Sequence, residues 1–206
     1  MKRRHFVILA LLPSLLSLGN AALADSSPGT EAVRQANETI TKLLRKKTKP
    51  GSKAEKELAT KVAASVRQFL DVDSLGERAL RDHWAKLSPD QQKEFMTLLR
   101  QLIESNYIKG LRSNLKYKVE YLGEKNKGKS VVVSTEVKTR RRNRPYTLSI
   151  DYVLRDDGGK LRAFDVITDG VGLVENYRAQ FNKIIAKHGF DGLLKRMRKK
   201  ADKMTQ

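Results

Sequence analysis

Residues 131–155 have the sequence VVVSTEVKTRRRNRPYTLSIDYVLR, in which apolar and polar side chains alternate over most of the length. Alternation with a period of two predicts two strands, 131–137 and 146–155, each with one buried face and one solvated face. The polar segment Arg140-Arg141-Arg142-Asn143 between them predicts a turn. This part of the chain is therefore expected to form an antiparallel hairpin.

Two flanking segments extend the predicted sheet. Residues 116–122 precede a turn rich in Lys, Asn and Gly, and residues 160–168 follow the turn Asp156-Asp157-Gly158-Gly159. Turn residues between short apolar segments are typical of strands joined in hairpins. The sequence thus predicts four antiparallel strands.

Helices are predicted before and after the sheet, because apolar residues there recur at steps of three and four. Residues 25–30 are small and polar and are expected to be a flexible leader. Ser88 and Gln91 form a predicted capping box at a helix start, and Gly189 is expected to end a helix. The expected helical spans are 33–47, 53–70, 89–110, 171–187 and 191–202, with a further short element over residues 74–80. The predicted fold is α+β, with helices packed on one face of a curved four-stranded antiparallel sheet.

Residues 1–24 have the pattern of a signal peptide. Three basic residues precede the apolar stretch Phe6 to Leu18, and Ala22-Leu23-Ala24 is an A-x-A cleavage site. The apolar stretch is shorter than the roughly 20 residues that span a bilayer, and its strong apolarity favours general secretion over twin-arginine export. The sequence predicts a periplasmic protein in which residues 25–206 form a single domain, without disulfides because the chain has no cysteine.

The charge of the expected mature chain calls for an anionic partner. After residue 24 there are 39 basic and 23 acidic residues, a net charge of +16. Export excludes nucleic acid as a partner, which leaves phospholipid headgroups, lipopolysaccharide or an acidic protein. One alternative is a basic periplasmic scaffold or binding module with a filled core that grips anionic envelope components; a surface kept basic for solubility is another.

Sequence motifs for catalysis are sparse. His83 and His188 are the histidines of the expected mature chain, and neither has a recognisable metal-binding spacing. Both are expected to be structural, and neither a metal nor a cofactor is predicted. Asp165 is the candidate general base if the chain is a small-molecule isomerase or hydrolase, and a surface or capping group otherwise.

A set of short motifs runs from Leu75 to the end of the chain. The motifs are Leu75-Gly76, Ala79-Leu80, His83-Trp84, Leu87-Ser88-Pro89, Gln91-Gln92, Phe95, Phe164-Asp165-Val166, Asp169-Gly170-Val171-Gly172-Leu173-Val174, Tyr177-Arg178, Phe181 and Gly189-Phe190-Asp191-Gly192-Leu193. In their order and spacing they resemble the MlaC family of periplasmic phospholipid shuttles, also called the toluene-tolerance auxiliary component family. Gly172, where a serine is common, and the three consecutive arginines depart from the family pattern.

This resemblance implies a soluble carrier and not an enzyme, with acyl chains held in an apolar cavity between the sheet and the helices. Its ligand would be a glycerophospholipid, moved between an outer-membrane lipid complex and an inner-membrane ABC transporter complex, with transient membrane contact and a role in outer-membrane lipid asymmetry. Arg140, Arg141, Arg142 and Arg178 are the candidates for contact with headgroups or membrane. The candidates for contact with acyl chains, each of which is equally suited to an ordinary core, are Trp84, Phe95, Leu98, Leu99, Leu102, Val133, Val137, Tyr146, Leu148, Ile150, Tyr152, Phe164, Val166, Val171, Leu173, Val174, Tyr177 and Phe181.

Overall fold

The computed structural model describes residues 27–49, 51–113, 117–141 and 144–205. The predicted signal peptide lies outside these residues. Within the described part of the chain, no helix combines the length and apolarity needed to cross a membrane.

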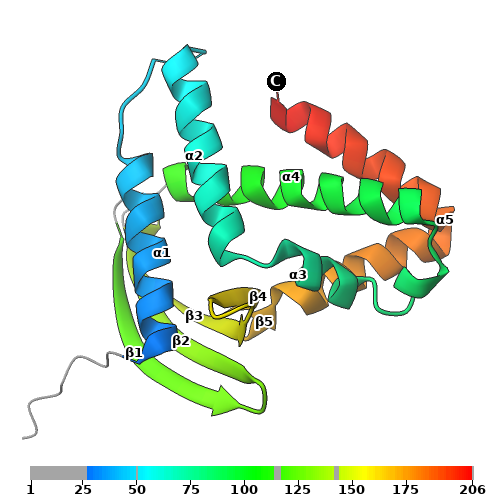
Figure 1. Ribbon diagram of the computed structural model, residues 1–206. Coiled ribbons are helices and arrows are strands. Elements are labelled where there is room, and N and C mark those ends of the chain that lie inside the picture. The colour runs from blue at the N-terminus through cyan, green and yellow to red at the C-terminus, as the bar shows by residue number, and fades with distance from the viewer. Residues whose placement is uncertain (1–26, 50, 114–116, 142–143, 206) are drawn as a thin grey trace, which may run out of the picture.

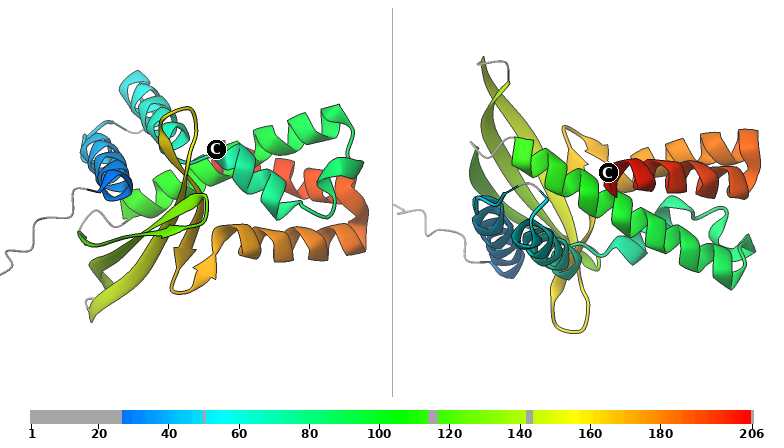
Figure 2. Two further views of the ribbon diagram at one scale, coloured as in Figure 1. Left: turned by 60° about the horizontal axis from the view of Figure 1, so that its bottom comes forward. Right: turned by 90° about the horizontal axis from the view of Figure 1, so that it is seen from above.

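Helices precede and follow the sheet, as predicted (Figure 1). They are α1 (Pro28–Leu44), α2 (Lys53–Phe69), α3 (Val72–Ala79), the 3-10 turn η1 (Trp84–Lys86), α4 (Pro89–Ser113) and α5 (Leu173–Thr205). Figure 2 shows that α3, α4 and α5 form a group extending away from the sheet, whereas α1 and α2 lie beside each other against another part of it. The predicted α+β class is confirmed.

The strands form one antiparallel sheet in the order β1-β2-β3-β4-β5. Their bounds are β1 (Lys118–Lys127), β2 (Ser130–Arg141), β3 (Arg144–Asp156), β4 (Leu161–Thr168) and β5 (Val171–Gly172). The sequence predicts four strands, and the fifth consists of two residues that were expected to begin the last helices. Val171 and Gly172 pair with the end of β4 instead, so α5 begins at Leu173.

The prediction of a flexible leader over residues 25–30 is wrong from Pro28 onward, where α1 already begins, and residues 25 and 26 lie outside the described residues. Thr30 is fully buried, and its backbone amide donates a 2.7 Å hydrogen bond to the Glu124 carboxylate of β1. Gly29 allows this close approach, since a Cβ there would lie 2.5 Å from the same carboxylate. The small residues Gly29 and Thr30 allow the first turn of α1 to pack closely on β1. Their composition alone does not distinguish this role from that of a flexible segment.

Two predicted helix boundaries are confirmed. Ser88 and Gln91 exchange side-chain-to-backbone hydrogen bonds of 3.1 and 3.2 Å at the start of α4, as in a capping box. Gly189 has φ 68° and ψ 176°, so it interrupts α5 and turns its second half back along α4. In Figure 1 the two halves meet at a sharp bend.

Candidate functional site

An apolar cavity of about 600 Å³ lies between the sheet and the helices. Every named strand from β1 to β5 contributes to its wall, together with α1, α2, α4 and α5. Its lining residues are Asn37, Ile40, Val66, Phe69, Leu70, Ile103, Asn106, Tyr117, Val119, Val137, Thr139, Leu148, Ile150, Tyr152, Val166, Thr168, Val171, Leu173, Asn176 and Tyr177.

This cavity wall is largely apolar. None of these lining residues is an Asp, Glu, Lys, Arg or His, and most are aliphatic. Val171 is 59% exposed although it lines the cavity, so it marks an opening to solvent. A cavity of this size without charge suits hydrocarbon, because an ionic group would lose its hydration there without compensation.

Two hydrogen-bonded groups of polar side chains contribute to the wall. On one side, the Tyr117 hydroxyl donates a 3.2 Å hydrogen bond to Asn37 Oδ1 and lies 2.6 Å from the Thr41 hydroxyl. On the other side, the Tyr177 hydroxyl is hydrogen-bonded to the Asn106 side chain, and burial raises the pKa of this hydroxyl above its ordinary value. The first group joins α1 to the start of β1, and the second joins α4 to α5.

Comparison with known proteins places this geometry in a family. The family model "MlaC protein" matches residues 34–199. The chain belongs to the MlaC family. A curated relative, the intermembrane phospholipid transport system binding protein MlaC of Haemophilus influenzae, is 21% identical over 201 residues, which cover 97% of this chain and 94% of the relative.

A solved structure has the same fold as this MlaC-family chain. It is a phospholipid-binding protein from Ralstonia solanacearum, determined in complex with a phospholipid. The match has a TM-score of 0.67 at 19% identity and covers 87% of this chain and all of the other.

The MlaC-family fold brings eight of the predicted acyl-chain contacts to the cavity wall. They come from β2 to β5 and from the start of α5. The period-two pattern predicted the buried faces of β2 and β3, whereas Val171, Leu173 and Tyr177 were predicted on a helix. They are Val137, Leu148, Ile150, Tyr152, Val166, Val171, Leu173 and Tyr177. Contact of each with a lipid stays a prediction.

The other ten predicted contacts do not line the cavity. Most belong to the packed core, where Phe95 is fully buried and its ring lies edge-on to Trp84 and to Phe181, at centroid distances of 6.2 and 5.4 Å. Tyr146 is half-buried near the end of the β2–β3 hairpin. The ten are Trp84, Phe95, Leu98, Leu99, Leu102, Val133, Tyr146, Phe164, Val174 and Phe181.

Sequence reasoning also missed part of the wall. The apolar stripes of the first two helices were recognised, but nothing in their spacing distinguishes residues on a cavity from residues in a core. Val119 could have been found, since it pairs directly with Val137 across β1 and β2. The wall residues that were not predicted are Asn37, Ile40, Val66, Phe69, Leu70, Ile103, Asn106, Tyr117, Val119, Thr139, Thr168 and Asn176.

The predicted arginine contacts lie in two different settings. Arg140 is exposed and directly follows the cavity residue Thr139, whereas Arg142 and the side chain of Arg141 lie outside the described residues. Arg178 donates hydrogen bonds of 3.3 and 2.7 Å to the backbone carbonyl of Arg78. It therefore ties α5 to the end of α3, and its role in headgroup contact stays a prediction.

Asp165, the candidate catalytic group, and the two histidines each have a hydrogen-bond partner within the protein. Asp165 Oδ1 accepts hydrogen bonds from the backbone amides of Val166 and Val174, at 2.9 and 3.0 Å, so it caps the start of α5. His83 Nε2 lies 2.9 Å from Asn182 Oδ1, and His188 Nε2 lies 2.8 Å from the Arg196 guanidinium. Among the described residues, no group of three or more His, Cys, Asp and Glu could hold a metal ion.

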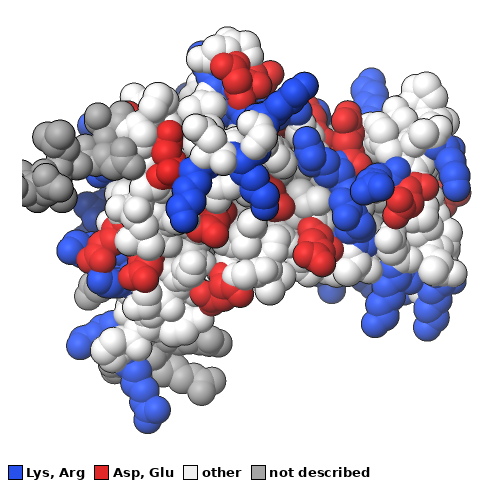
Figure 3. All heavy atoms as spheres, turned by 90° about the horizontal axis from the view of Figure 1, so that it is seen from below, with Lys and Arg blue, Asp and Glu red and all other residues white. Residues whose placement is uncertain are grey.

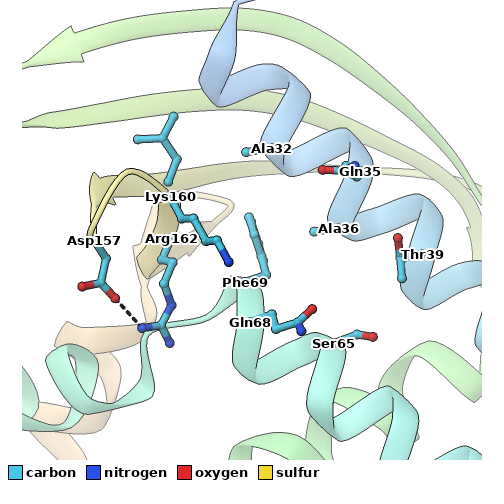
Figure 4. Close-up of a pocket in the computed structure, with 11 residues that line it drawn as sticks. Ala32, Gln35, Ala36, Thr39, Ser65, Gln68, Phe69, Asp157, Lys160 and Arg162 are labelled. Carbon is cyan, nitrogen blue, oxygen red and sulfur yellow. Dashed lines mark hydrogen bonds and ion pairs between the residues drawn. The ribbon is translucent and has the colours of Figure 1, made fainter.

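A second hollow of about 760 Å³ lies between α1, α2 and the β3–β4 turn. Figure 4 shows Gln35 and Thr39 of α1 across it from Gln68 of α2 and the charged side chains of Lys160 and Arg162. Arg162 is held by Asp157 at 2.6 Å. These polar and charged groups make the hollow unsuitable for hydrocarbon, so the smaller apolar cavity is the candidate site.

Proposed function

We propose that this MlaC-family chain is a phospholipid carrier of the periplasm, to which the predicted signal peptide directs it. It holds acyl chains in the apolar cavity and leaves the phosphate headgroup in water at the opening beside Val171. It shuttles glycerophospholipid between an outer-membrane complex and an inner-membrane ABC transporter complex. In this proposal the protein catalyses no reaction.

The observation that carries the proposal is the cavity wall, in which no described lining residue bears an acidic or basic side chain. Burial of hydrocarbon is worth roughly 0.8 kcal/mol per methylene group, so two chains of about 15 carbons represent on the order of 24 kcal/mol. A soluble carrier has to supply most of this free energy of burial in place of the bilayer. The names of the Haemophilus and Ralstonia proteins, which both refer to phospholipid, support the same ligand.

Contact with anionic membranes is part of the proposal. Figure 3 shows Lys and Arg side chains over the face seen from below, gathered most densely on the side that carries α3 and α5, with Asp and Glu between them. Near the cavity, Arg140 and Arg144 are exposed close to the turn of the β2–β3 hairpin. We propose that these two arginines meet lipid phosphates while an acyl chain enters or leaves.

The proposal is tested by filling the cavity. Ile150 lies on the central strand β3 and lines the wall, so Ile150→Trp occupies space that a lipid tail would need. Protein purified from a bacterial periplasm is expected to carry phospholipid, and Ile150→Trp is expected to carry several-fold less. Lipid extraction with mass spectrometry measures both.

Leu122→Trp is the matched control, because Leu122 is 61% exposed on β1 and does not line the cavity. It introduces the same side chain and is expected to leave the lipid content unchanged. Wild-type protein that is purified empty, or equal lipid loading of Ile150→Trp and wild type with both folded, would contradict the proposal.

A further inference from the structure

The apolar cavity is closed at one end along strand β3. Leu148, Ile150 and Tyr152 are successive inward-facing residues of β3, and all three line the cavity. The next inward-facing residue, Leu154, is fully buried in the core and is not part of the wall. Val133, which pairs with Tyr152 across β2 and β3, is also fully buried and does not line the cavity. Along the sheet, the cavity therefore ends at the level of Tyr152.

Phe69, the last residue of α2, completes this closed end. Its ring lies edge-on to that of Tyr152, with a centroid distance of 5.7 Å and an interplanar angle of 63°. Among the described residues, Phe69 is the one that lines both the apolar cavity and the hollow between α1, α2 and the β3–β4 turn. Figure 4 shows its side chain at the end of α2 among the residues that line this hollow. One aromatic ring thus separates the two spaces where they meet.

The two spaces differ in what they can hold. None of the described residues that line the cavity is charged, whereas the hollow beyond Phe69 contains Asp157, Lys160 and Arg162. A hydrocarbon chain that passed Phe69 would leave an apolar wall and meet charged groups and water. Each methylene group left without apolar surroundings lowers the affinity about fourfold. Steric contact with the ring and the polarity of the hollow therefore limit an acyl chain at the same point.

The way into the cavity lies on the hairpin side of Tyr152. Val171, at the opening, pairs with Thr168, and Thr168 pairs with Ile150. Ile150 is two residues nearer than Tyr152 to the turn between β2 and β3. A tail that enters beside Val171 or from the hairpin therefore approaches the closed end of the cavity with its methyl end first.

The length of the cavity along the sheet suits one acyl chain. Thr139, at the hairpin end of the wall, pairs with Tyr146, and Tyr152 lies six residues further along β3. Six residues of a strand span about 20 Å. The hydrocarbon core of a bilayer is about 30 Å thick, so a tail in one leaflet occupies about 15 Å. A tail of ordinary length that starts at the hairpin end therefore reaches Phe69.

We propose, resting on the carrier function above, that Phe69 is the specificity-determining residue for acyl-chain length. The methyl ends of the bound tails contact its ring, and tails too long for the space between the hairpin end and Phe69 are bound less tightly. Removing the ring opens the closed end toward the hollow and relaxes the limit, whereas a larger ring tightens it.

A competition between two chain lengths tests the proposal. Delipidated full-length mature protein is incubated with vesicles that contain equal amounts of dipalmitoleoyl and dieicosenoyl phosphatidylglycerol, whose chains differ by four carbons. Native mass spectrometry of the re-isolated protein gives the ratio bound. Wild type is expected to bind the shorter lipid in at least about tenfold excess, because two methylene groups without apolar contact already account for that factor. Phe69→Ala is expected to reduce this excess at least about fourfold, and Phe69→Trp is expected to increase it.

Leu148→Ala is the matched control. It removes apolar bulk from the same cavity wall, four residues nearer the hairpin turn than Tyr152, where a tail passes but does not end. This variant is expected to keep the wild-type ratio of the two lipids. Equal binding of both lipids by wild type, an unchanged ratio in Phe69→Ala, or an equal change in Leu148→Ala would overturn the inference.

A second measurement uses wild-type protein alone and does not depend on the folding of a variant. Phosphatidylglycerol with a diazirine at the methyl end of one chain is loaded and irradiated, and peptide mass spectrometry locates the attachment. Attachment is expected at Phe69, at Tyr152 or at Val66, one turn before Phe69 on α2. Attachment mainly at Val137 and Leu148 would overturn the inference alone. Uptake of none of these lipids would overturn the proposed carrier function as well.

Discussion

At the scale of single residues, Asp165 links the sheet to α5, the helix that begins two residues after the cavity opening at Val171. Gly172 precedes the first residue of α5 and has no side chain to cap it, and the carboxylate of Asp165 on β4 accepts from the Val174 amide instead. A Cβ at Gly172 would lie 3.2 Å from Asp165 Oδ2, so the missing side chain leaves room for this carboxylate. The capping oxygen comes from a neighbouring strand.

Replacing Asp165 by alanine is expected to destabilise the fold and to leave lipid binding in place. Loss of a helix cap typically costs about 0.5–2 kcal/mol of unfolding free energy. Chemical denaturation measures that loss, and lipid extraction measures the loading of the folded variant. If Asp165 were a catalytic base, the variant would lose a turnover that wild type has while keeping its stability, and that pattern would refute the capping role.

The residues of the candidate site were only partly predictable, for a physical reason. Alternation along β2 and β3 identified Val137, Leu148 and Ile150, because successive side chains of a strand point to opposite faces of the sheet and the apolar ones share the covered face. Helical stripes gave no such discrimination: Phe95 and Leu99 face other side chains, and Ile103, one turn further along α4, faces the cavity. Whether an apolar side chain meets another side chain or a hollow depends on partners distant in sequence.

At the scale of elements, α5 is interrupted at Gly189, where the sequence predicted the end of a helix. Gly189 lies in a backbone region that is essentially restricted to glycine, and beyond it Leu193, Met197 and Ala201 are buried in the core. Helix starts and stops depend on local chemistry, which explains why Ser88 and Gly189 were predicted correctly. The start of α1 and the two-residue β5 depend on contacts with β1 and β4, which local patterns do not contain.

Gly189→Ala is expected to lower the unfolding free energy by about 1–3 kcal/mol, because alanine is strained at φ 68° and ψ 176°. Thermal or denaturant unfolding measures the change. Lys187→Ala, at an exposed position two residues earlier, is the control and is expected to change stability by less than about 0.5 kcal/mol. Equal stabilities of Gly189→Ala and the control would show that the bend imposes no glycine requirement.

At the scale of the whole molecule, charge and cavity are separated. The apolar wall carries no acidic or basic side chain, while the sequence beyond residue 24 has a net charge of +16. Arg140 and Arg144 lie near the point where the two meet, since Thr139 belongs to the wall and the next residues turn into β3. In a carrier built this way, the rim formed by Arg140 and Arg144 meets an anionic surface, and the apolar interior takes up the hydrocarbon.

Reversing the charge at this rim is expected to slow uptake of lipid from anionic vesicles. Each basic residue near an anionic surface contributes about 1 kcal/mol, so the double variant Arg140→Glu with Arg144→Glu should slow uptake roughly tenfold or more at low salt. The effect should fade near 1 M salt, where the screening length is about 3 Å, and should be absent with neutral vesicles. Dequenching of a fluorescent phospholipid measures the rate of uptake.

The control is the double variant Lys199→Glu with Lys200→Glu, which changes the net charge equally at exposed positions on the second half of α5. Equal slowing by both pairs would mean that total charge, and not the hairpin beside the cavity, governs the encounter.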